Sequence, residues 1–170
     1  MFREPLVNST IFVQGPVVQE LHLTYSPFVT HIKRIYAGQE SLENEYVIGP
    51  IPVSDGKGKE IITRYATNFP TERGEFFTDS NGRQMLRRLR NHRDSWNFNS
   101  TTEPVSSNYF PVTSRIAIRD PNGQVQFTVL TDRSQGGSSL ADGEVELMLH
   151  RRLLHDDAFG VNEALNEEAF

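Results

Sequence analysis

The sequence predicts an all-β protein, an antiparallel β-sandwich of about eight to ten strands. Segments that alternate apolar and polar residues, the period of a half-buried strand, recur along the chain with turn residues between them. Two pairs of these segments flank residues 79–82 (DSNG) and 120–123 (DPNG), which are typical of tight hairpin turns. No window of about eleven or more residues carries an apolar stripe at helical spacing, so helices are not expected.

Each strand is predicted from its alternation, its β-branched and aromatic residues, or a neighbouring turn. Pro50 and Pro52 keep the segment after residue 48 extended and incompatible with a helix. The polar segment 94–107 is expected to be a loop anchored by Trp96 and Phe98. The expected strands, in chain order, are 17–25, 28–36, 42–48, 60–65, 74–78, 83–89, 109–119, 124–130 and 143–149.

Composition and charge exclude several classes of function. The chain has 170 residues, enough for one domain, and its 11 Phe and 5 Tyr offset a low hydrophobic content of 36%. The net charge of -5 comes without a charged block, which argues against a nucleic-acid partner; the basic run 83–93 contains apolar residues, as on a solvated strand face. No apolar run approaches the ~20 residues of a membrane-spanning helix, so no membrane partner is expected.

The ends and the cysteine content give two further expectations. The first residues do not resemble a signal peptide, and both ends look like cut edges of a longer chain. Because the chain has no cysteine, it can form no disulfide of its own.

The stretch 129–157 organises the rest of the chain, because a strand, a Gly/Ser-rich segment and a long second strand follow one another in it. Apolar residues of the second strand share one face: Val145, Leu147 and Leu149. Continued alternation places Arg151 on this same face and Arg152 on the opposite one. A guanidinium at the end of a buried face needs a carboxylate, a carbonyl or a bound ligand as its partner.

The residues alone identify no metal site in this stretch. His150 and His155 lie near Asp156 and Asp157, but their spacing fits no zinc pattern, and a strand would point the two histidines to opposite faces. A local ion-pair cluster between these aspartates and the preceding arginines is the simpler interpretation.

The residues also identify no catalytic machinery. The segment 134–139 is rich in Gly and Ser, but it lacks the Lys and the helix start of a phosphate-binding loop and is expected to be a flexible loop. No nucleophile elbow occurs, and no carboxylate sits among apolar neighbours as a proton donor would. Tyr109 and Phe110 are expected to be core aromatics rather than a sugar-stacking platform.

Six separate segments, in order and nearly without gaps, carry a resemblance to a known family. They are VIGPIPV at 47–53, GKEII at 58–62, FTDSNGR at 77–83, TEPV with NYFPV at 102–112, LTDRSQGGSSL at 130–140, and HRRLL at 150–154 followed by two aspartates. These segments resemble the class II α-mannosidases, glycoside hydrolase family 38, and most of all its lysosomal members. One departure is Ala158, where the family pattern leads us to expect glycine.

The resemblance implies that residues 1–170 are part of the C-terminal β domain of a larger, retaining α-mannosidase, with a supersandwich-like fold. The partner of this domain would be a catalytic α/β domain of the same protein, which carries the catalytic carboxylates and a Zn²⁺ ion. No catalytic residue and no metal ligand is expected in this chain, which should be inactive alone. The resemblance also implies a lysosomal location and mannose-containing glycans as ligands.

The same resemblance assigns roles to particular residues. One arginine of the family's Arg-Arg pair contacts the bound sugar, so Arg151 and Arg152 are the expected substrate-binding residues. The sequons at Asn8 and Asn99 become candidate glycosylation sites in a protein of the secretory pathway, and Asn99, in a polar loop, is the better one. The alternative hypothesis is an autonomous carbohydrate-binding or interaction β-sandwich. The two hypotheses differ in that a part of a larger enzyme should expose a large apolar face.

Overall fold

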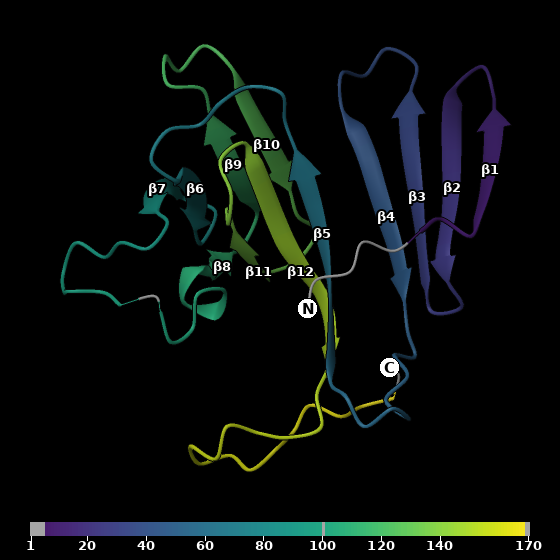
Figure 1. Cartoon of the computed structure of the whole chain (residues 1–170). Coiled ribbons are helices and arrows are strands. Elements are labelled where there is room, and N and C mark those ends of the chain that lie inside the picture. Colours follow the sequence, from purple (N-terminus) through teal and green to yellow (C-terminus); the bar gives the residue numbers. More distant parts are fainter. Residues whose placement is uncertain (1–5, 100, 169–170) are drawn as a thin grey trace. The chain divides into compact units, whose positions relative to one another are not determined.

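The computed structural model describes residues 6–99 and 101–168, and nearly all regular structure within them is β-strand (Figure 1). The described strands number twelve and form three antiparallel sheets of four strands each. In the same residues the only helical element is a single 3-10 turn, Ser106–Asn108, and no helix is long and apolar enough to cross a membrane. The predicted all-β fold is confirmed, with more strands than the about eight to ten expected.

The three sheets have the strand orders β1-β2-β3-β4, β10-β9-β6-β7 and β5-β12-β11-β8. The strands are β1 (Ser9–Gln14), β2 (Val18–Ser26), β3 (Val29–Tyr36), β4 (Leu42–Ile48), β5 (Lys59–Ala66), β6 (Glu75–Ser80), β7 (Gln84–Leu89), β8 (Phe110–Val112), β9 (Arg115–Arg119), β10 (Gln126–Leu130), β11 (Gln135–Ser138) and β12 (Glu144–Arg152). Contacts divide the chain into two compact units, one of Met1–Lys59 with Arg151–Phe170 and one of Glu60–His150. That residues 1–170 belong to one C-terminal β domain stays a prediction.

The hydrophobic core of the unit Glu60–His150 lies between two sheets and makes this unit a sandwich. Strands β6 and β9 of one sheet and β8 and β12 of the other supply its fully buried side chains, which are Phe76, Val112, Ile116, Ile118, Val145 and Leu147. The apolar face predicted for the long strand is therefore confirmed at Val145 and Leu147. The backbone at Gly137 comes so close to this core that a Cβ atom there would lie 2.6 Å from Val112 Cγ2, which only glycine avoids.

Both predicted hairpins are present. Strands β6 and β7 pair antiparallel around residues 79–82, where Asn81 and Gly82 take the positive φ angles that this tight turn needs. Strands β9 and β10 pair around residues 120–123, and the Gly123 amide donates a hydrogen bond of 3.0 Å to the carbonyl of Asp120. Local turn chemistry was a sufficient signal at both places.

The predicted strand 109–119 is divided into β8 and β9 by a single carboxylate. Asp79 Oδ1 accepts hydrogen bonds from the amides of Thr113, Ser114 and Arg115 at 2.8, 3.0 and 3.2 Å, and Oδ2 accepts one from Gly82 at 2.7 Å. These amides bind the side chain in place of a neighbouring strand. Burial alone would raise the pKa of Asp79, but the four backbone donors outweigh it and hold that pKa well below its usual value.

Two strands were missed by sequence reasoning. The Gly/Ser segment expected to be a flexible loop contains β11, which pairs with β12 on one side and β8 on the other, so that expectation was wrong. Gly137 and Ser138 are buried there because their small size lets the neighbouring layers approach. Strand β1 was also not predicted, although its residues include Ile11, Phe12 and Val13.

Candidate functional site

Arg152, at the end of β12, is the more buried member of the arginine pair, with 9% of its surface exposed. Its Nη1 donates a hydrogen bond of 2.9 Å to the carbonyl of Ile51, and its Nε donates one of 2.8 Å to Asn166 Oδ1. Its Nη2 lies 3.6 Å from Glu168 Oε1. The Arg152 guanidinium is thus held by the carbonyl and polar groups that a buried cation requires.

Arg151 is half-buried, and alternation along β12 directs it to the face opposite Arg152. Sequence alternation favoured Arg151 as the inward arginine, yet Arg152 is the more deeply buried of the two. The apolar face already opens at Leu149, which is half-buried, so it does not continue to Arg151. Residues 51 and 166–168 bury Arg152 instead, and these distant segments leave no signal in the local pattern.

A buried polar cluster that sequence reasoning did not identify lies on the sheet β5-β12-β11-β8. Glu146 in β12 is only 2% exposed, and its Oε2 accepts hydrogen bonds from Arg64 Nη2 at 2.6 Å and Nε at 3.0 Å. The Tyr109 hydroxyl donates a hydrogen bond of 2.5 Å to Glu146 Oε1. The Tyr109 ring lies over Gly136, where a Cβ atom would be 3.1 Å from Tyr109 Cδ1. Small residues in β11 thus make room for this ring.

The hydrogen bonds of this cluster indicate a structural role rather than a role in proton transfer. Burial raises the pKa of Tyr109, and the hydrogen bond to the Glu146 carboxylate raises it further, because a phenolate beside a carboxylate is unfavourable. Tyr109 therefore stays neutral and donates a hydrogen bond to Glu146. Since both oxygens of Glu146 are engaged, by Arg64 and Tyr109, this carboxylate is not placed to act on a substrate.

The metal-ligating residue types do not come together in the described part of the chain. Within residues 6–99 and 101–168, no group of three or more His, Cys, Asp or Glu side chains could hold a metal ion. His150, His155, Asp156 and Asp157, considered as a possible cluster from the sequence, form no such group. These residues do not fit a zinc site.

The two sequons differ in how their asparagine side chains are held. Asn8 is exposed, and its Nδ2 donates a hydrogen bond of 3.0 Å to the carbonyl of Tyr25 in β2. Asn99 is also exposed, but it uses its amide oxygen instead: Oδ1 accepts hydrogen bonds from Thr101 N at 3.0 Å and Thr101 Oγ1 at 2.7 Å. Ser100, the middle residue of the second sequon, lies outside the described residues.

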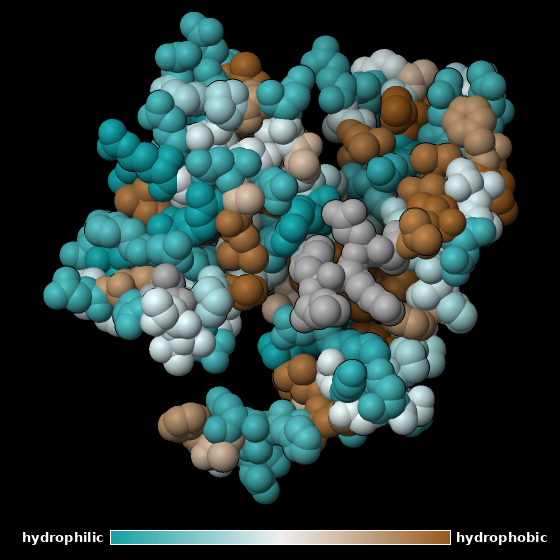
Figure 2. Space-filling view, viewed as in Figure 1, coloured by the Kyte–Doolittle hydropathy of each residue, from teal (hydrophilic) through white to brown (hydrophobic). Residues whose placement is uncertain are grey.

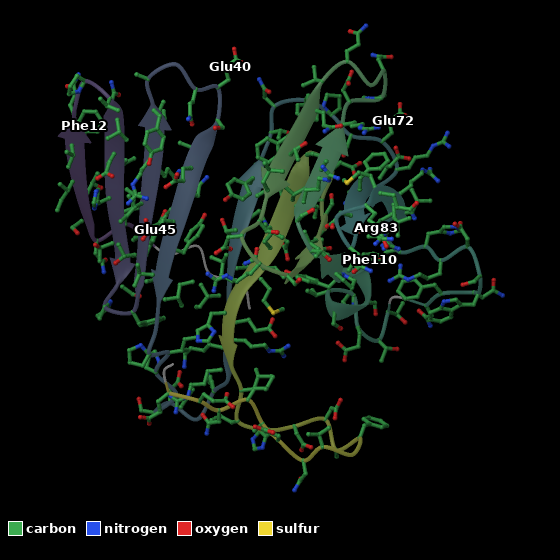
Figure 3. The ribbon with its side chains drawn as sticks, turned by 180° about the vertical axis from the view of Figure 1, so that it is seen from behind. Phe12, Glu40, Glu45, Glu72, Arg83 and Phe110 are labelled. Carbon is green, nitrogen blue, oxygen red and sulfur yellow. The ribbon has the colours of Figure 1, made fainter. Side chains whose placement is uncertain are left out.

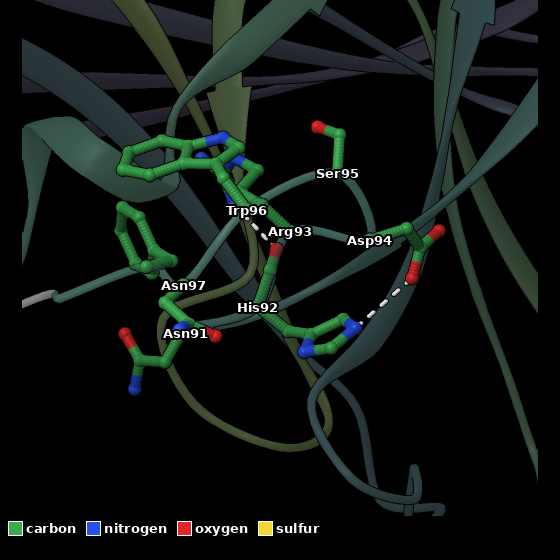
Figure 4. Close-up of a pocket in the computed structure, with 8 residues that line it drawn as sticks. Asn91, His92, Arg93, Asp94, Ser95, Trp96 and Asn97 are labelled. Atoms are coloured by element: carbon green, nitrogen blue, oxygen red, sulfur yellow. Dashed lines mark hydrogen bonds and ion pairs between the residues drawn. The ribbon is translucent and has the colours of Figure 1, made fainter.

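An open cavity of about 570 Å³ is lined by the loop 91–98 (Figure 4). Arg93 stabilises this loop, because its guanidinium stacks on the rings of Phe98 and Phe110 at 4.6 and 4.5 Å from their centroids. His92 Nε2 lies 2.9 Å from Asp94 Oδ1. Trp96, one of the two expected anchors, packs edge-on against Phe98, the other, although 59% of the Trp96 surface is exposed.

Exposed apolar side chains also occur on the sheet β1-β2-β3-β4, where brown residues lie among teal and white ones in Figure 2. Every residue of β1 is exposed, and Figure 3 shows Phe12 on this strand. Large exposed apolar residues in or beside this sheet are Leu6, Val7, Ile11, Phe12, Val13, Val17, Ile35, Leu42 and Val47. Register and alternation place Phe12, Ile35 and Leu42 on one face of this sheet. Ile11, Val13 and Val47 lie on the other face, so the sheet leaves large apolar side chains exposed on both faces.

Polar residues of the same sheet form a cross-strand ion cluster. Arg34 in β3 donates to Glu20 at 2.6 Å, to Glu43 at 2.8 Å and to Glu45 at 2.5 Å, and His22 Nε2 lies 2.8 Å from Glu20. The register places Glu20 and Glu43 directly opposite Arg34 on the two neighbouring strands, and Glu45 diagonally across from it. The cluster fixes that register without forming a catalytic arrangement.

Comparison with known proteins gives one family. The model of the glycosyl hydrolases family 38 C-terminal domain matches residues 3–159. Lysosomal alpha-mannosidase of Bos taurus is 57% identical over 159 residues, which cover 94% of this chain and 16% of that protein. Lysosomal alpha-mannosidase of Homo sapiens is 55% identical over 155 residues, or 91% of this chain and 15% of that protein. Alpha-mannosidase of Canavalia ensiformis is 45% identical over 159 residues, with coverage of 94% and 16%.

Proposed function

The chain belongs to glycosyl hydrolase family 38, as its C-terminal domain, and from this premise we propose that it is the non-catalytic β region of a lysosomal-type α-mannosidase. The whole enzyme would hydrolyse terminal α-D-mannosyl residues of glycoproteins and oligosaccharides by the retaining, two-carboxylate route. The 57% identity over 94% of the chain to the bovine lysosomal protein carries this proposal. Because the chain spans 16% of that relative, we assign the bond-breaking groups to the remaining polypeptide.

The partner of this chain is the catalytic α/β domain of the same protein. The exposed apolar residues of the sheet β1-β2-β3-β4 support this proposal, because a part of a larger enzyme should leave more apolar side chains exposed than a protein that is complete by itself. An autonomous binding module would instead be expected to bury them. We assign the Zn²⁺ ion that the resemblance implies to the catalytic domain, and the described residues of this chain hold no group of three or more metal-ligating side chains.

Arg151 is our candidate for the sugar contact. Arg152 is held by Ile51, Asn166 and Glu168. Arg151 is half-buried, and alternation along β12 directs it to the opposite face of the strand. A guanidinium is a permanently charged fork of donors that suits sugar hydroxyl pairs and carboxylates. Arg151 would therefore position mannose-containing glycans, while Arg152 fixes the end of the strand that carries it.

The expected glycosylation belongs to the same proposal. Lysosomal proteins pass through the secretory pathway, where Asn8 and Asn99 would be acceptors. Asn99 is the better acceptor because its hydrogen bonds to Thr101 use only the amide oxygen, whereas the Asn8 amide nitrogen is bonded to the Tyr25 carbonyl.

The test is to express the catalytic half of the parent with and without this chain and to measure release of mannose from an aryl α-mannoside. We expect activity only when both are present. Release of mannose by this chain alone, or full activity of the catalytic half without it, would contradict the proposal.

A second test separates the two arginines in the whole enzyme. Arg151→Ala should lower kcat/KM by about tenfold or more with an unchanged melting temperature, because it removes a charged substrate contact. Arg152→Ala should lower the melting temperature, because it removes a buried cation and leaves the Ile51 carbonyl without its donor. Arg133→Ala is the matched control, since Arg133 is exposed and pairs with the exposed Asp132 beside it. Unchanged kinetics of the Arg151 variant would exclude a sugar contact.

A further inference from the structure

Trp96 is the only tryptophan of the chain, and its indole is held in an exposed position. It packs edge-on against the ring of Phe98, with centroids 5.4 Å apart and an angle of 89° between the planes. Phe98 is in turn fixed by the Arg93 guanidinium. A large aromatic face presented to water on a supported loop is a surface on which an apolar group can stack.

Asn99 lies three residues after Trp96, within about 10 Å along even an extended chain. Its amide oxygen is engaged by Thr101 N and Thr101 Oγ1. Its amide nitrogen is the atom to which an N-linked glycan would be attached. The first sugar attached to Asn99 would thus be close enough for its ring to reach the exposed indole of Trp96.

We propose that an N-linked glycan on Asn99 rests its first N-acetylglucosamine on the indole face of Trp96; this rests on the glycosylation proposed above. In the attachment step the Asn99 amide nitrogen forms a bond to the anomeric carbon of a polyisoprenyl-diphosphate oligosaccharide. The bond from that carbon to the diphosphate breaks, the diphosphate leaves, and the amide loses one proton.

The physical reason is that one face of a pyranose presents mainly C–H groups, which stack on an electron-rich aromatic ring. Stacking removes apolar indole surface from water, and the hydroxyl groups on the ring's edge stay solvated or meet the polar side chains of the cavity. The glycan would then cover the residue that the protein part of the loop leaves exposed.

Asn8 provides an internal comparison. It carries the same sequon type, but its amide nitrogen is bonded to the Tyr25 carbonyl, and no tryptophan lies near it in the sequence. Since Trp96 is the only tryptophan, its fluorescence reports on the Asn99 site alone.

The experiment uses the full 170-residue chain secreted from eukaryotic cells that keep glycans in the high-mannose form. Mass spectrometry first measures glycan occupancy at Asn99 and Asn8. Acrylamide quenching of Trp96 fluorescence is then compared in untreated protein, in protein trimmed to the first sugar by an endoglycosidase, and in protein stripped of all sugar by an amidase. We expect similar quenching in the first two and about twofold stronger quenching in the third. Asn99→Gln should match the stripped protein, and Asn8→Gln should match the untreated one.

A second measurement does not require the isolated chain and can be made on the whole enzyme. The endoglycosidase should trim the Asn99 glycan faster in Trp96→Ala than in Trp96→Phe or the unchanged protein, while the Asn8 glycan is trimmed at the same rate in all three. If Asn99 carries no glycan, the proposed glycosylation fails and this inference fails with it. If Asn99 is occupied but quenching and trimming do not depend on the first sugar or on Trp96, only the stacking inference is overturned.

Discussion

The sandwich of the unit Glu60–His150 buries its large apolar side chains, whereas the sheet β1-β2-β3-β4 leaves many of them exposed. The sandwich closes two sheets over six side chains that are at most 2% exposed. Among the described residues, the strands of the four-stranded sheet contain one buried apolar side chain, Leu23, which is 8% exposed, and they leave Phe12 59% exposed. The first region completes its core with its own residues, whereas the second leaves large apolar side chains exposed on both of its faces.

The largest expected effect tests the closed core against the open sheet. Phe76→Ala should lower the free energy of unfolding by about 4 kcal/mol, because it leaves a cavity between the two sheets. Phe12→Ala is the matched control and should cost less than about 0.5 kcal/mol in the isolated chain. Denaturant unfolding of both variants measures the difference. Equal losses would mean that the sheet is already covered in the isolated chain.

Asp79→Asn should cost about 2 kcal/mol near neutral pH, because an amide cannot replace both oxygens that accept four backbone donors. The folded-state pKa of Asp79 lies below the unfolded value of about 3.9, so this stabilisation is present above about pH 4 and is lost as the pH falls through the folded pKa. Unfolding measured at several pH values should therefore show the difference between the variant and the unchanged chain shrinking in acid. A constant difference down to strong acid would contradict this account.

Tyr109→Phe should cost about 1.5 kcal/mol, because Glu146 then keeps only its bonds to Arg64 while one buried oxygen loses its donor. The ring remains over Gly136, so packing in the sandwich is preserved and the change isolates one hydrogen bond. Thermal unfolding is the measurement, and Tyr36→Phe in β3 is the control, with no measurable change expected. A loss as large as that of Phe76→Ala would show that Tyr109 acts through packing instead.

The smallest effect distinguishes the two regions by pH. Burial lowers the pKa of His31 in β3, although its hydrogen bond to Asn44 Oδ1 opposes the shift. The unfolded chain binds a proton at about pH 6.5, so the sheet should lose some stability as the pH falls from about 6.5 through the folded pKa. Hydrogen exchange, corrected for intrinsic rates, should show β3 amides losing protection in this range while β9 amides keep theirs. The difference should be absent in His31→Gln.

Sequence reasoning succeeded where the signal was local. The hairpins at 79–82 and 120–123 were predicted because turn residues alone specify them. It failed at β11, because Gly and Ser have low strand propensity and only the neighbours β12 and β8 make them a strand. Most strands could thus be predicted from local sequence, whereas the others depend on tertiary packing that local sequence does not reveal.

At the candidate site, too, local sequence features could be predicted, whereas contacts between distant residues could not. The arginine pair could be located from the sequence, but the relative burial of Arg151 and Arg152 depends on residues about 100 positions away and near the C-terminus. The contact between Tyr109 and Glu146 joins residues that are 37 positions apart and leaves no periodic trace. Alternation along a strand assigns a side chain to a face, but it cannot show which distant segment covers that face.

The edge strand β1 makes this region prone to aggregation when it is separated from the rest of the enzyme. It lies at the edge of its sheet, is exposed along its whole length, and its sequence STIFVQ contains no charge, no proline and no glycine. Such an edge offers a free row of amides and carbonyls on which an identical strand can pair, and six uncharged residues of this kind are enough to begin a cross-β stack. Proteolytic release of this region would therefore create a seed for fibrous aggregation, and a single lysine at position 11 should block its growth.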